Sequence, residues 1–501
     1  MDSSHSILRS AKFFFAGTLL SRFSGLARDM AMAFFFGSAP EVAGFMVAYR
    51  LAYVFRRLFG EGTIQAGFVP HFEQLRSGSN QEAALFYRDM AWSLGISLLI
   101  LVAILETAMG FLRPVLGSDW QEIASLAMWM IPGLFFLCLF ALHGALLQCQ
   151  KKTFWAAAAP LAFNAAWIAA AFTSKSMTAL ALGVGVGCAV QWLVTAFQVR
   201  KELALPWSAW FRPRLFSSDW KQLLKPMTLG IIGVGAVQIN SALDAIFARF
   251  ADLSGPAYLW YAIRVEQLPL ALFGIALSGA LLPPLARVLA AGDTVRYREL
   301  LQGALQQSLT LMLPCTFGIF ALASSGLNLL YGRGDFSQTS VAATTQCLWA
   351  YGLSLIPSVF VLILAQGFFA RRSYATPTKA SLLAVAANIA LNALLVFGLH
   401  FGAASIAIAT SASAWINCWV LARALDAPMP QKWGRLLLAC ALPASLVLGL
   451  DSLWPLEQGL LAQLSRFALN AAMYAGGVLG LAKTFGVEGI FELFQKKAPE
   501  T

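Results

Sequence analysis

The sequence predicts an all-α membrane protein of about fourteen transmembrane helices. Of its 501 residues, 59% are hydrophobic and only 12% are charged, whereas charged residues make up about 25% of a soluble domain. Apolar segments of about 20 residues, the length that crosses a bilayer as a helix, recur from Phe13 almost to the C-terminus. Such a chain cannot bury its apolar surface in water, so we expect the bilayer to be its solvent.

The expected spans follow one another with short connections. They cover approximately residues 11–37, 42–70, 83–112, 122–149, 156–174, 177–199, 222–250, 257–286, 299–325, 342–370, 378–399, 402–422, 436–453 and 461–482. The longest polar connection, about residues 201–221, is short, basic and contains proline. The first span resembles a signal peptide in having Arg9 and Lys12 before an apolar segment, but it lacks the short apolar core and small-residue cleavage site.

The distribution of basic residues predicts the orientation. Loop lysines and arginines collect on the cytoplasmic side of membrane proteins. With the N-terminus inside, most of the 35 Lys and Arg residues lie on that side. Those that fall outside are Arg113, Lys175, Arg249, Arg333 and Arg466. We therefore expect both termini in the cytoplasm, and the formal charge of +11 requires no nucleic-acid partner.

An internal repeat predicts two similar lobes. Residues 47–50 (Val-Ala-Tyr-Arg) match residues 261–264 (Tyr-Ala-Ile-Arg) at an offset of 214, and residues 151–154 match residues 371–374 at an offset of 220. Spans 1–6 thus correspond to spans 7–12. Because six is even, the lobes share one topology, and we expect a pseudo-two-fold axis along the membrane normal to relate them.

The repeat also gives the expected domains. A six-helix lobe covers residues 1–205 and a second six-helix lobe covers residues 206–425. Residues 426–501 add two C-terminal helices and a cytoplasmic tail.

Arginines inside the apolar spans are the main functional signal. They are Arg22, Arg28, Arg50, Arg56, Arg57 and Arg264. An arginine at a helix centre costs about 2.5–3.5 kcal/mol on insertion scales, so these side chains require a water-filled cavity or partners. Guanidinium groups suit phosphate, because the planar fork donates two parallel hydrogen bonds and stays charged. We predict that most of them face a cavity for an anionic group.

Internal ion pairing is the alternative. Arg57 and Glu61 are i,i+4 neighbours, and for Arg57 pairing and substrate contact are equally favoured. Asp29 follows Arg28, and Arg50 shares a helix face with Arg57. For Arg22, Arg28, Arg56 and Arg264 the cavity is favoured, since the first lobe has too few acids in its spans to neutralise all its arginines.

The second lobe carries oxygen-bearing side chains, and its Asp244 corresponds to Arg28 of the first lobe at an offset of 216. Asp244, together with Asn388 and Asn392 one turn apart on one span, offers ligands that suit a small cation. Hydrogen bonding between helices is the favoured alternative for these residues.

Other patterns exclude some functions. The glycine run of residues 183–187 lies inside an apolar span, where it favours close helix packing over nucleotide binding. The chain has no P-loop, and its seven cysteines lie in or beside apolar spans without a C-x-x-C pair. His143 and His400 are isolated from other catalytic residue types. We expect a transporter without a bound cofactor rather than an enzyme.

Several segments resemble the MurJ (MviN) family of lipid II flippases, which belongs to the multidrug, oligosaccharidyl-lipid and polysaccharide exporter superfamily. The resemblance runs from the N-terminus to about residue 400. The segments that carry it are residues 21–29 (Ser-Arg-Phe-Ser-Gly-Leu-Ala-Arg-Asp), 45–51 (Phe-Met-Val-Ala-Tyr-Arg-Leu), 56–62 (Arg-Arg-Leu-Phe-Gly-Glu-Gly), 66–70, 261–264, 331–334 and 376–377.

The resemblance implies transport of an undecaprenyl-diphosphate-linked disaccharide-pentapeptide, lipid II, between leaflets of the bacterial inner membrane for cell-wall synthesis. Arg22, Arg28, Arg56 and Arg264 match the family's cavity arginines, and Glu61 matches an acid near the portal. Spans 13 and 14 would form a groove for the lipid tail, and cell-wall synthesis proteins are expected partners.

The sequence also departs from the family pattern. Val42 and Ala43 stand where relatives often carry Thr-Asp, and Ala52 stands where Pro is common. The family's sodium sites correspond only loosely to Asp244 and the two asparagines, so either a coupling ion such as sodium or the membrane potential could drive transport. The rival functions are export of another polyprenyl-linked glycan, drug or cation antiport on the same fold, a membrane enzyme that acts on lipid-linked sugars, and a scaffold in the cell-wall machinery.

Overall fold

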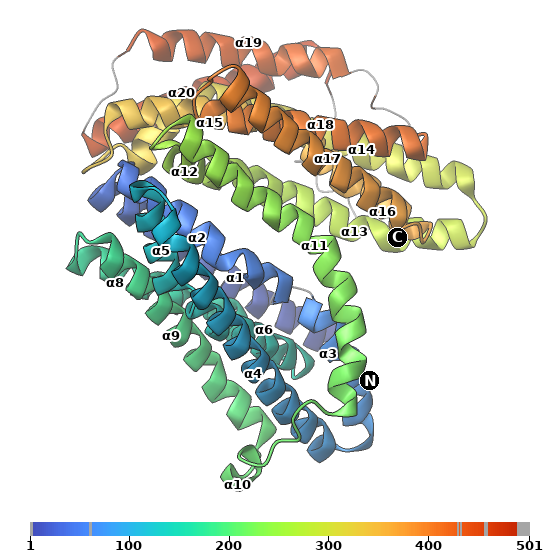
Figure 1. The fold of residues 1–501 in the computed structure, drawn as a ribbon. Coiled ribbons are helices and arrows are strands. Elements are labelled where there is room, and N and C mark those ends of the chain that lie inside the picture. Colours follow the sequence, from blue (N-terminus) through green and yellow to red (C-terminus); the bar gives the residue numbers. More distant parts are fainter. Residues whose placement is uncertain (1–3, 60–62, 428–429, 431–432, 455–458, 488–501) are drawn as a thin grey trace. The chain divides into compact units, whose positions relative to one another are not determined.

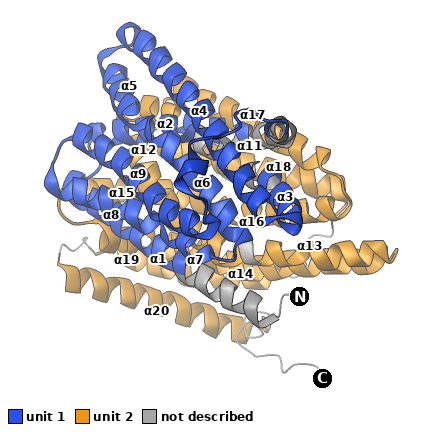
Figure 2. Cartoon of the chain, turned by 90° about the horizontal axis from the view of Figure 1, so that it is seen from below, with its two compact units in different colours: residues 1–245 blue, residues 246–501 orange. Residues whose placement is uncertain are grey.

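The computed structural model is helical throughout its described part, which comprises residues 4–59, 63–427, 430, 433–454 and 459–487. Within the helices, the side chains of residues 4–16, 55–59, 63–66, 219, 221–234, 236–237 and 275–276 are outside the description. No strand occurs in these described ranges, which confirms the all-α prediction. The chain divides into two compact units, Met1–Ala245 and Ile246–Thr501 (Figure 2).

Unit 1 contains the first helices of the chain (Figure 1). In order they are α1 (Ser4–Phe36), α2 (Pro40–Phe59), α3 (Thr63–Gly78), α4 (Asn80–Leu112), the 3₁₀ turn η1 (Arg113–Val115), α5 (Ser118–Met130), α6 (Gly133–Cys149), α7 (Thr153–Ala158), α8 (Pro160–Thr173), α9 (Met177–Leu203), α10 (Trp207–Trp210) and most of α11 (Ser218–Ala251).

Unit 2 begins near the end of α11 and continues to the C-terminus. Its helices are α12 (Gly255–Pro269), the π-helical turn η2 (Leu270–Gly274), α13 (Ile275–Ala290), α14 (Thr294–Tyr331), α15 (Gln338–Gly352), α16 (Leu355–Ala370), α17 (Ala375–Ala393), the π-helical turn η3 (Leu394–Gly398), α18 (Ala404–Leu425), α19 (Trp433–Ser452) and α20 (Leu460–Thr484). The predicted boundaries at 205/206 and 425/426 stay predictions.

In the described residues, each predicted span lies mainly on one of these helices or on two that follow one another, with η2 between α12 and α13. Among the described residues, nine helical segments are long and apolar enough to cross a membrane, and the pair α5–α6, bent by 42°, makes ten. Arginines and acids within α1 and α2 make these helices less apolar. The structure thus supports a multi-pass membrane protein, while the number of fourteen stays a prediction.

The order of helices repeats between the units, as the sequence offsets predict. Helix α14 begins 214 residues after α4, and α15 begins 220 residues after α5. The break between α5 and α6 recurs between α15 and α16. The axis that relates the two lobes stays a prediction.

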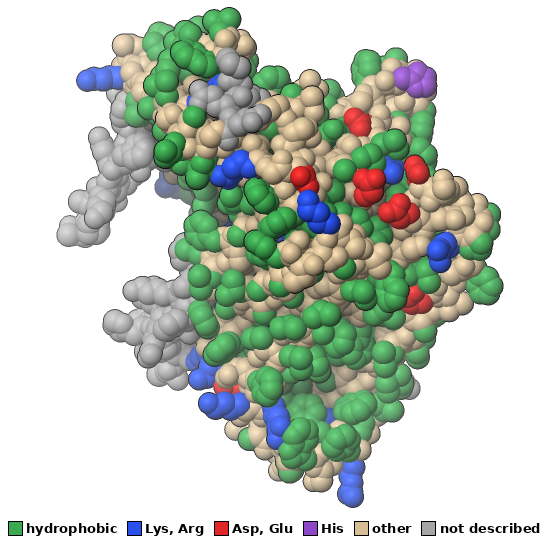
Figure 3. Space-filling view, turned by 90° about the vertical axis from the view of Figure 1, so that its left-hand side faces the viewer, with side chains coloured by type: hydrophobic (Ala, Val, Ile, Leu, Met, Phe, Trp, Pro, Cys, Tyr) green, Lys and Arg blue, Asp and Glu red, His purple; other side chains and the backbone are tan. Residues whose placement is uncertain are grey.

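The surface carries large apolar side chains where a soluble protein would carry charge. Phe197 on α9 is 74% exposed and Leu461 on α20 is 83% exposed. Figure 3 shows hydrophobic side chains spread over much of one face, with few charged groups between them. Such a surface is suited to contact with lipid tails rather than with water.

The basic connection after α9 is held against α4. Four hydrogen bonds of 2.9–3.0 Å join the two segments: Arg88 Nη1 to the carbonyl of Ala209, Trp92 Nε1 to the carbonyl of Trp210, the amide of Arg214 to Asp89 Oδ1, and the amide of Phe216 to Ser93 Oγ. The connection that the sequence presents as a polar linker is therefore a fixed part of unit 1.

The glycine run in α9 lets that helix approach α8 closely, as predicted. A Cβ atom at Gly183 would lie 2.4 Å from Ala170 Cβ, and one at Gly187 would lie 3.0 Å from the Phe163 ring. Gly185 lies on another face, where a Cβ would make an ordinary 3.7 Å contact with the carbonyl of Trp129.

This difference predicts opposite effects of two substitutions on one helix. Gly183→Ala should destabilise the protein by about 1–3 kcal/mol, because α8 and α9 must move apart. Gly185→Ala should leave stability unchanged or raise it by up to about 1 kcal/mol, because alanine has the higher helix propensity. Thermal unfolding of the two purified variants measures both effects, and equal melting temperatures would contradict the packing.

Candidate functional site

Arg28 lies in a polar cluster where α1 packs against α8. Its Nε and Nη2 donate to Oδ1 of Asp29 at 3.0 and 2.7 Å, and its Nη1 donates to Oδ1 of Asn164 at 3.1 Å. The guanidinium carbon also lies 4.7 Å from the ring centroid of Trp167. Arg28 and Asp29 are both buried, with 7% and 2% of their surfaces exposed. The ion pair therefore gives this buried site a net charge near zero.

The partner residue Asn164 extends the cluster to the preceding turn of α1. Its Nδ2 donates to Ser24 Oγ at 2.8 Å, and Ser24 Oγ donates to the carbonyl of Ser21 at 2.9 Å. A polar chain thus runs from Arg28 through α8 to the turn next to Arg22. Sequence reasoning named Asp29 as a possible partner but missed Asn164 and Trp167, which are 136 or more residues away in the chain.

Arg22 differs from Arg28 in accessibility. It lies six residues earlier on the same helix, about 9 Å along the axis, and its side chain is exposed. Arg50 on α2 is half-buried, and its Nη1 donates to the carbonyl of Ser241 on α11 at 3.1 Å. Arg22 can therefore reach a group outside the helix pair, whereas Arg50 links two helices of unit 1.

Three predicted residues cannot be placed. The side chains of Arg56 and Arg57, near the end of α2, are outside the described residues, and so is Glu61 as a whole. Their assignment to the site stays a prediction.

Arg264 lies on α12 in unit 2. It is half-buried, and its guanidinium carbon lies 4.3 Å from the ring centroid of Trp260, one turn earlier. Arg28 and Arg264 thus share one arrangement, a guanidinium against a tryptophan ring. Such stacking holds the group in place through its flat face.

The asparagines of the predicted cation site are bonded to each other. Asn392 Nδ2 donates to Asn388 Oδ1 at 2.9 Å on α17, and Asn388 Nδ2 donates to Thr410 Oγ1 on α18 at 3.4 Å. Helix-to-helix hydrogen bonding, the favoured alternative, is thus present for Asn388. Asp244 is buried but belongs to unit 1, so its grouping with the asparagines stays a prediction.

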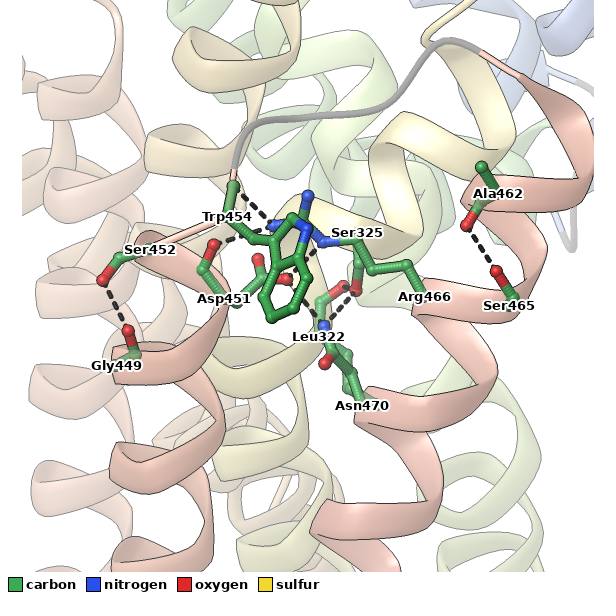
Figure 4. Close-up of polar contacts among 10 residues, drawn as sticks. All are labelled: Leu322, Ser325, Gly449, Asp451, Ser452, Trp454, Ala462, Ser465, Arg466 and Asn470. Atoms are coloured by element: carbon green, nitrogen blue, oxygen red, sulfur yellow. Dashed lines mark hydrogen bonds and ion pairs between the residues drawn. The ribbon is translucent and has the colours of Figure 1, made fainter.

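A polar cluster that the sequence did not reveal joins the last two helices to α14 (Figure 4). Arg466 Nε on α20 donates to Asp451 Oδ1 on α19 at 2.8 Å, and its Nη2 donates to the carbonyl of Asp451 at 2.7 Å. Asn470 Nδ2 donates to the same carboxylate oxygen at 2.7 Å and lies 3.3 Å from Ser325 Oγ on α14. The only sequence signal for the cluster was a pair of opposite charges at the facing ends of two consecutive spans.

Further contacts along α20 reach the same helix. Gln463 Nε2 donates to the carbonyl of Gly332 at 3.1 Å, and the hydroxyl of Tyr474 donates to the carbonyl of Pro314 at 2.7 Å. Residues 463, 470 and 474 lie on one face of α20. The two C-terminal helices are therefore fixed to unit 2 by a polar face, and their opposite faces carry exposed leucines.

The described residues show binding groups rather than a reaction centre. No group of three or more His, Cys, Asp or Glu side chains within the described ranges is placed to hold a metal ion. His143 Nδ1 lies 2.8 Å from Thr195 Oγ1, which joins α6 to α9 in keeping with a structural role. The stacked and hydrogen-bonded guanidinium groups suit recognition of an anion.

Comparisons of sequence place the chain among known proteins. A family model described as lipid II flippase MurJ matches residues 32–465. The chain is 30% identical to a probable lipid II flippase MurJ of Chlamydia pneumoniae, over 98% of this chain and 95% of the relative. It is also 30% identical to a protein with the same description from Rhizobium meliloti, over 94% of this chain and 92% of the relative.

Solved structures show the same fold. One described as lipid II flippase MurJ in an inward closed conformation matches with a TM-score of 0.75 and 22% identity, over 96% of this chain and 99% of that chain. An inward-facing multidrug resistance MATE family transporter of the MOP superfamily matches with a TM-score of 0.64 and 13% identity, over 81% and 95%. The family model and the full-length relatives confirm the resemblance seen in the sequence, and the chain belongs to the MurJ family of lipid II flippases.

Proposed function

We propose that this chain moves lipid II from the cytoplasmic to the outer leaflet of the bacterial inner membrane. The observation that carries this proposal is the match of residues 32–465 to the family model, together with relatives of nearly equal length described as probable lipid II flippases. No bond of the substrate changes, so the protein is a transporter and not an enzyme.

The arginines supply the proposed contact with the diphosphate. Arg22 is exposed and free to reach a ligand outside its helix pair, while Arg264 is held against Trp260 with its charge fixed in place. Arg56, Arg57 and Glu61 join the proposal by their place in the family's sequence segment, and Arg50 is a further proposed contact. A diphosphate carries several oxygens that accept from guanidinium groups.

Arg28 has a more specific role in this proposal. Because it pairs with Asp29 and stacks on Trp167, we infer that it orients the α1–α8 pair and presents part of its guanidinium edge to the diphosphate. Because Arg28 is buried, the dielectric constant around it is lower than in water, and a hydrogen bond from it to an anion is correspondingly stronger.

The movement follows alternating access. The cavity opens first to the cytoplasmic side and then to the outer side, while the polyprenyl tail stays in lipid beside α19 and α20. Both termini lie in the cytoplasm, and proteins of cell-wall synthesis are the expected partners.

The membrane potential is the proposed driving force. One charge that crosses the full field contributes about 2.3 kcal/mol per 100 mV, and the arginine-rich spans provide such charge. A sodium ion at Asp244, Asn388 and Asn392 is a second proposed coupling element.

Removal of single arginines of the proposed site tests the substrate contact. Arg22→Ala, Arg56→Ala and Arg264→Ala should fail to rescue a bacterium depleted of its own flippase, with lipid II lost from the outer leaflet. A charge-assisted hydrogen bond contributes about 1.5–3 kcal/mol, so each change should weaken binding about tenfold or more.

The matched control for this test is Arg296→Ala. Arg296 is an exposed arginine of α14 in a surface ion pair with Glu299, and its loss should leave rescue intact. Rescue by all three cavity variants would defeat the proposed site.

A double variant separates the two roles of Arg28. Arg28→Gln alone leaves Asp29 as a buried charge, which costs about 3–5 kcal/mol and should lower both protein level and flipping. Arg28→Gln with Asp29→Asn removes both charges and should restore the melting temperature but not lipid II transport. If the double variant transports normally, Arg28 serves only to neutralise Asp29.

Control of the voltage tests the driving force. Purified protein in liposomes should move lipid II faster when a potassium gradient with valinomycin imposes a potential, because charge moves with the conformational change. The rate is measured by the lipid II that an added, impermeant enzyme can modify. An unchanged rate after complete collapse of the potential would count against this part of the proposal.

A further inference from the structure

Glu266 is a buried acid in a membrane-spanning helix. It lies on α12, two residues after Arg264, and only 5% of its surface is exposed. Its carboxyl group has no ion pair with any residue in the described part of the chain. An ionised carboxylate in such a place is costly to bury, so the surroundings favour the neutral, protonated acid.

Within the described ranges, the carboxyl group has one hydrogen-bonded neighbour, Ser354. Ser354 Oγ lies 2.7 Å from the carbonyl oxygen of Tyr351 and 3.3 Å from Glu266 Oε1. A serine hydroxyl can donate only one hydrogen bond. The shorter contact indicates that Ser354 donates to the carbonyl oxygen of Tyr351 rather than to Glu266. Both contacts become full hydrogen bonds only if Glu266 carries a proton and donates it to Ser354 Oγ.

Charged groups on the neighbouring helices lie away from this acid. Helix α12 packs on η2, α14, α15 and α18. Cys347 and Tyr351 are the titratable side chains of α15, and η2 has none. On α14 the charged residues are confined to the first turns and on α18 to the last turn; they are Arg296, Arg298, Glu299 and Arg423.

Those charges are also engaged elsewhere. Arg296 pairs with Glu299, Arg298 pairs with Asp426, and Arg423 lies over Trp419. The remaining titratable groups of α14 and α18 are Tyr297, Cys315, Tyr331 and Cys418, which are uncharged at neutral pH. Among the described residues of these helices, no cation is placed to neutralise Glu266, so a proton is the group that can do so.

The acid also lies between two irregular points of the helical framework. The π-helical turn η2 begins four residues after Glu266, and Ser354 marks the break between α15 and α16. Irregular turns of this kind are frequent where helices bend in function. The contact between Glu266 and Ser354 thus joins a helix next to a π-helical turn to a break between two helices.

We propose that Glu266 and Ser354 form a proton-binding site whose occupancy controls the conformation of unit 2. The protonated acid stabilises the arrangement described above. Loss of the proton leaves a carboxylate that favours a conformation in which it reaches water, so the population of the present arrangement falls as the pH rises. The coupling of this change to lipid movement rests on the proposed function, whereas the proton site itself does not.

Infrared spectroscopy of the purified protein tests the site without any transport assay. The wild type at neutral pH should show a carbonyl band of a protonated carboxyl group that Glu266→Gln lacks. Glu106→Gln, which changes a half-exposed acid on α4, is the matched control and should keep the band. Ser354→Ala retains the acid but should shift the band, because the hydrogen-bond partner is lost. A spectrum of Glu266→Gln equal to that of the wild type would overturn the proposal.

Transport in sodium-free liposomes tests the coupling. The rate of lipid II movement by the wild type should change severalfold over a series of pH values around neutrality, and Glu266→Gln should remove this dependence while Glu106→Gln keeps it. If the wild type moves lipid II and Glu266→Gln shows the same pH profile, the coupling inference fails. If the wild type moves no lipid II at any pH, the proposed function fails, and the infrared result still decides the proton site.

Discussion

The high free energy of a charge in an apolar medium is the constraint on which this structure depends. Three ionisable groups inside the apolar helices illustrate how this cost is met. Arg28 is neutralised by Asp29, Arg466 is neutralised by Asp451, and a proton is the compensation that we propose for Glu266. Arg466 and Asp451 lie on different helices, and Arg28 also donates to Asn164 on α8, so these contacts help to determine which helices are held together. The polar side chains thus specify the packing that non-directional apolar contacts leave open.

The pairs divide the molecule into fixed and adaptable parts. The connection after α9 is held to α4, and the two C-terminal helices are held to α14, each by several hydrogen bonds. The acid at Glu266 lies instead beside a π-helical turn and a helix break. Conformational change in a transporter is easier when groups of helices move as units about a few flexible points. A small change at such a point can then shift a whole group of helices.

Sequence reasoning anticipated much of the fold and part of the site. The spans, the repeated order of helices and the close approach at Gly183 follow from hydropathy, offset and residue size, which are local or periodic properties. The arginines were found because charge is conspicuous in apolar segments. Two partners of Arg28 were missed, because Asn164 and Trp167 have no distinctive sequence context in their apolar helix. Only the packing of α8 on α1 brings them to Arg28.

The sequence by itself determined that the protein is helical and crosses the membrane several times, because its apolar segments have the length of membrane-spanning helices, which satisfy all their backbone hydrogen bonds internally. It also determined where the positive charges lie along the chain. Only the tertiary structure decided which charges are compensated: Arg28 is buried and paired, Arg22 is exposed, and Glu266 meets a single hydroxyl. The cost of burying a charge depends on the groups within a few ångströms of it, and several of these groups, such as Asn164 beside Arg28 and Ser354 beside Glu266, come from helices that are distant in the sequence.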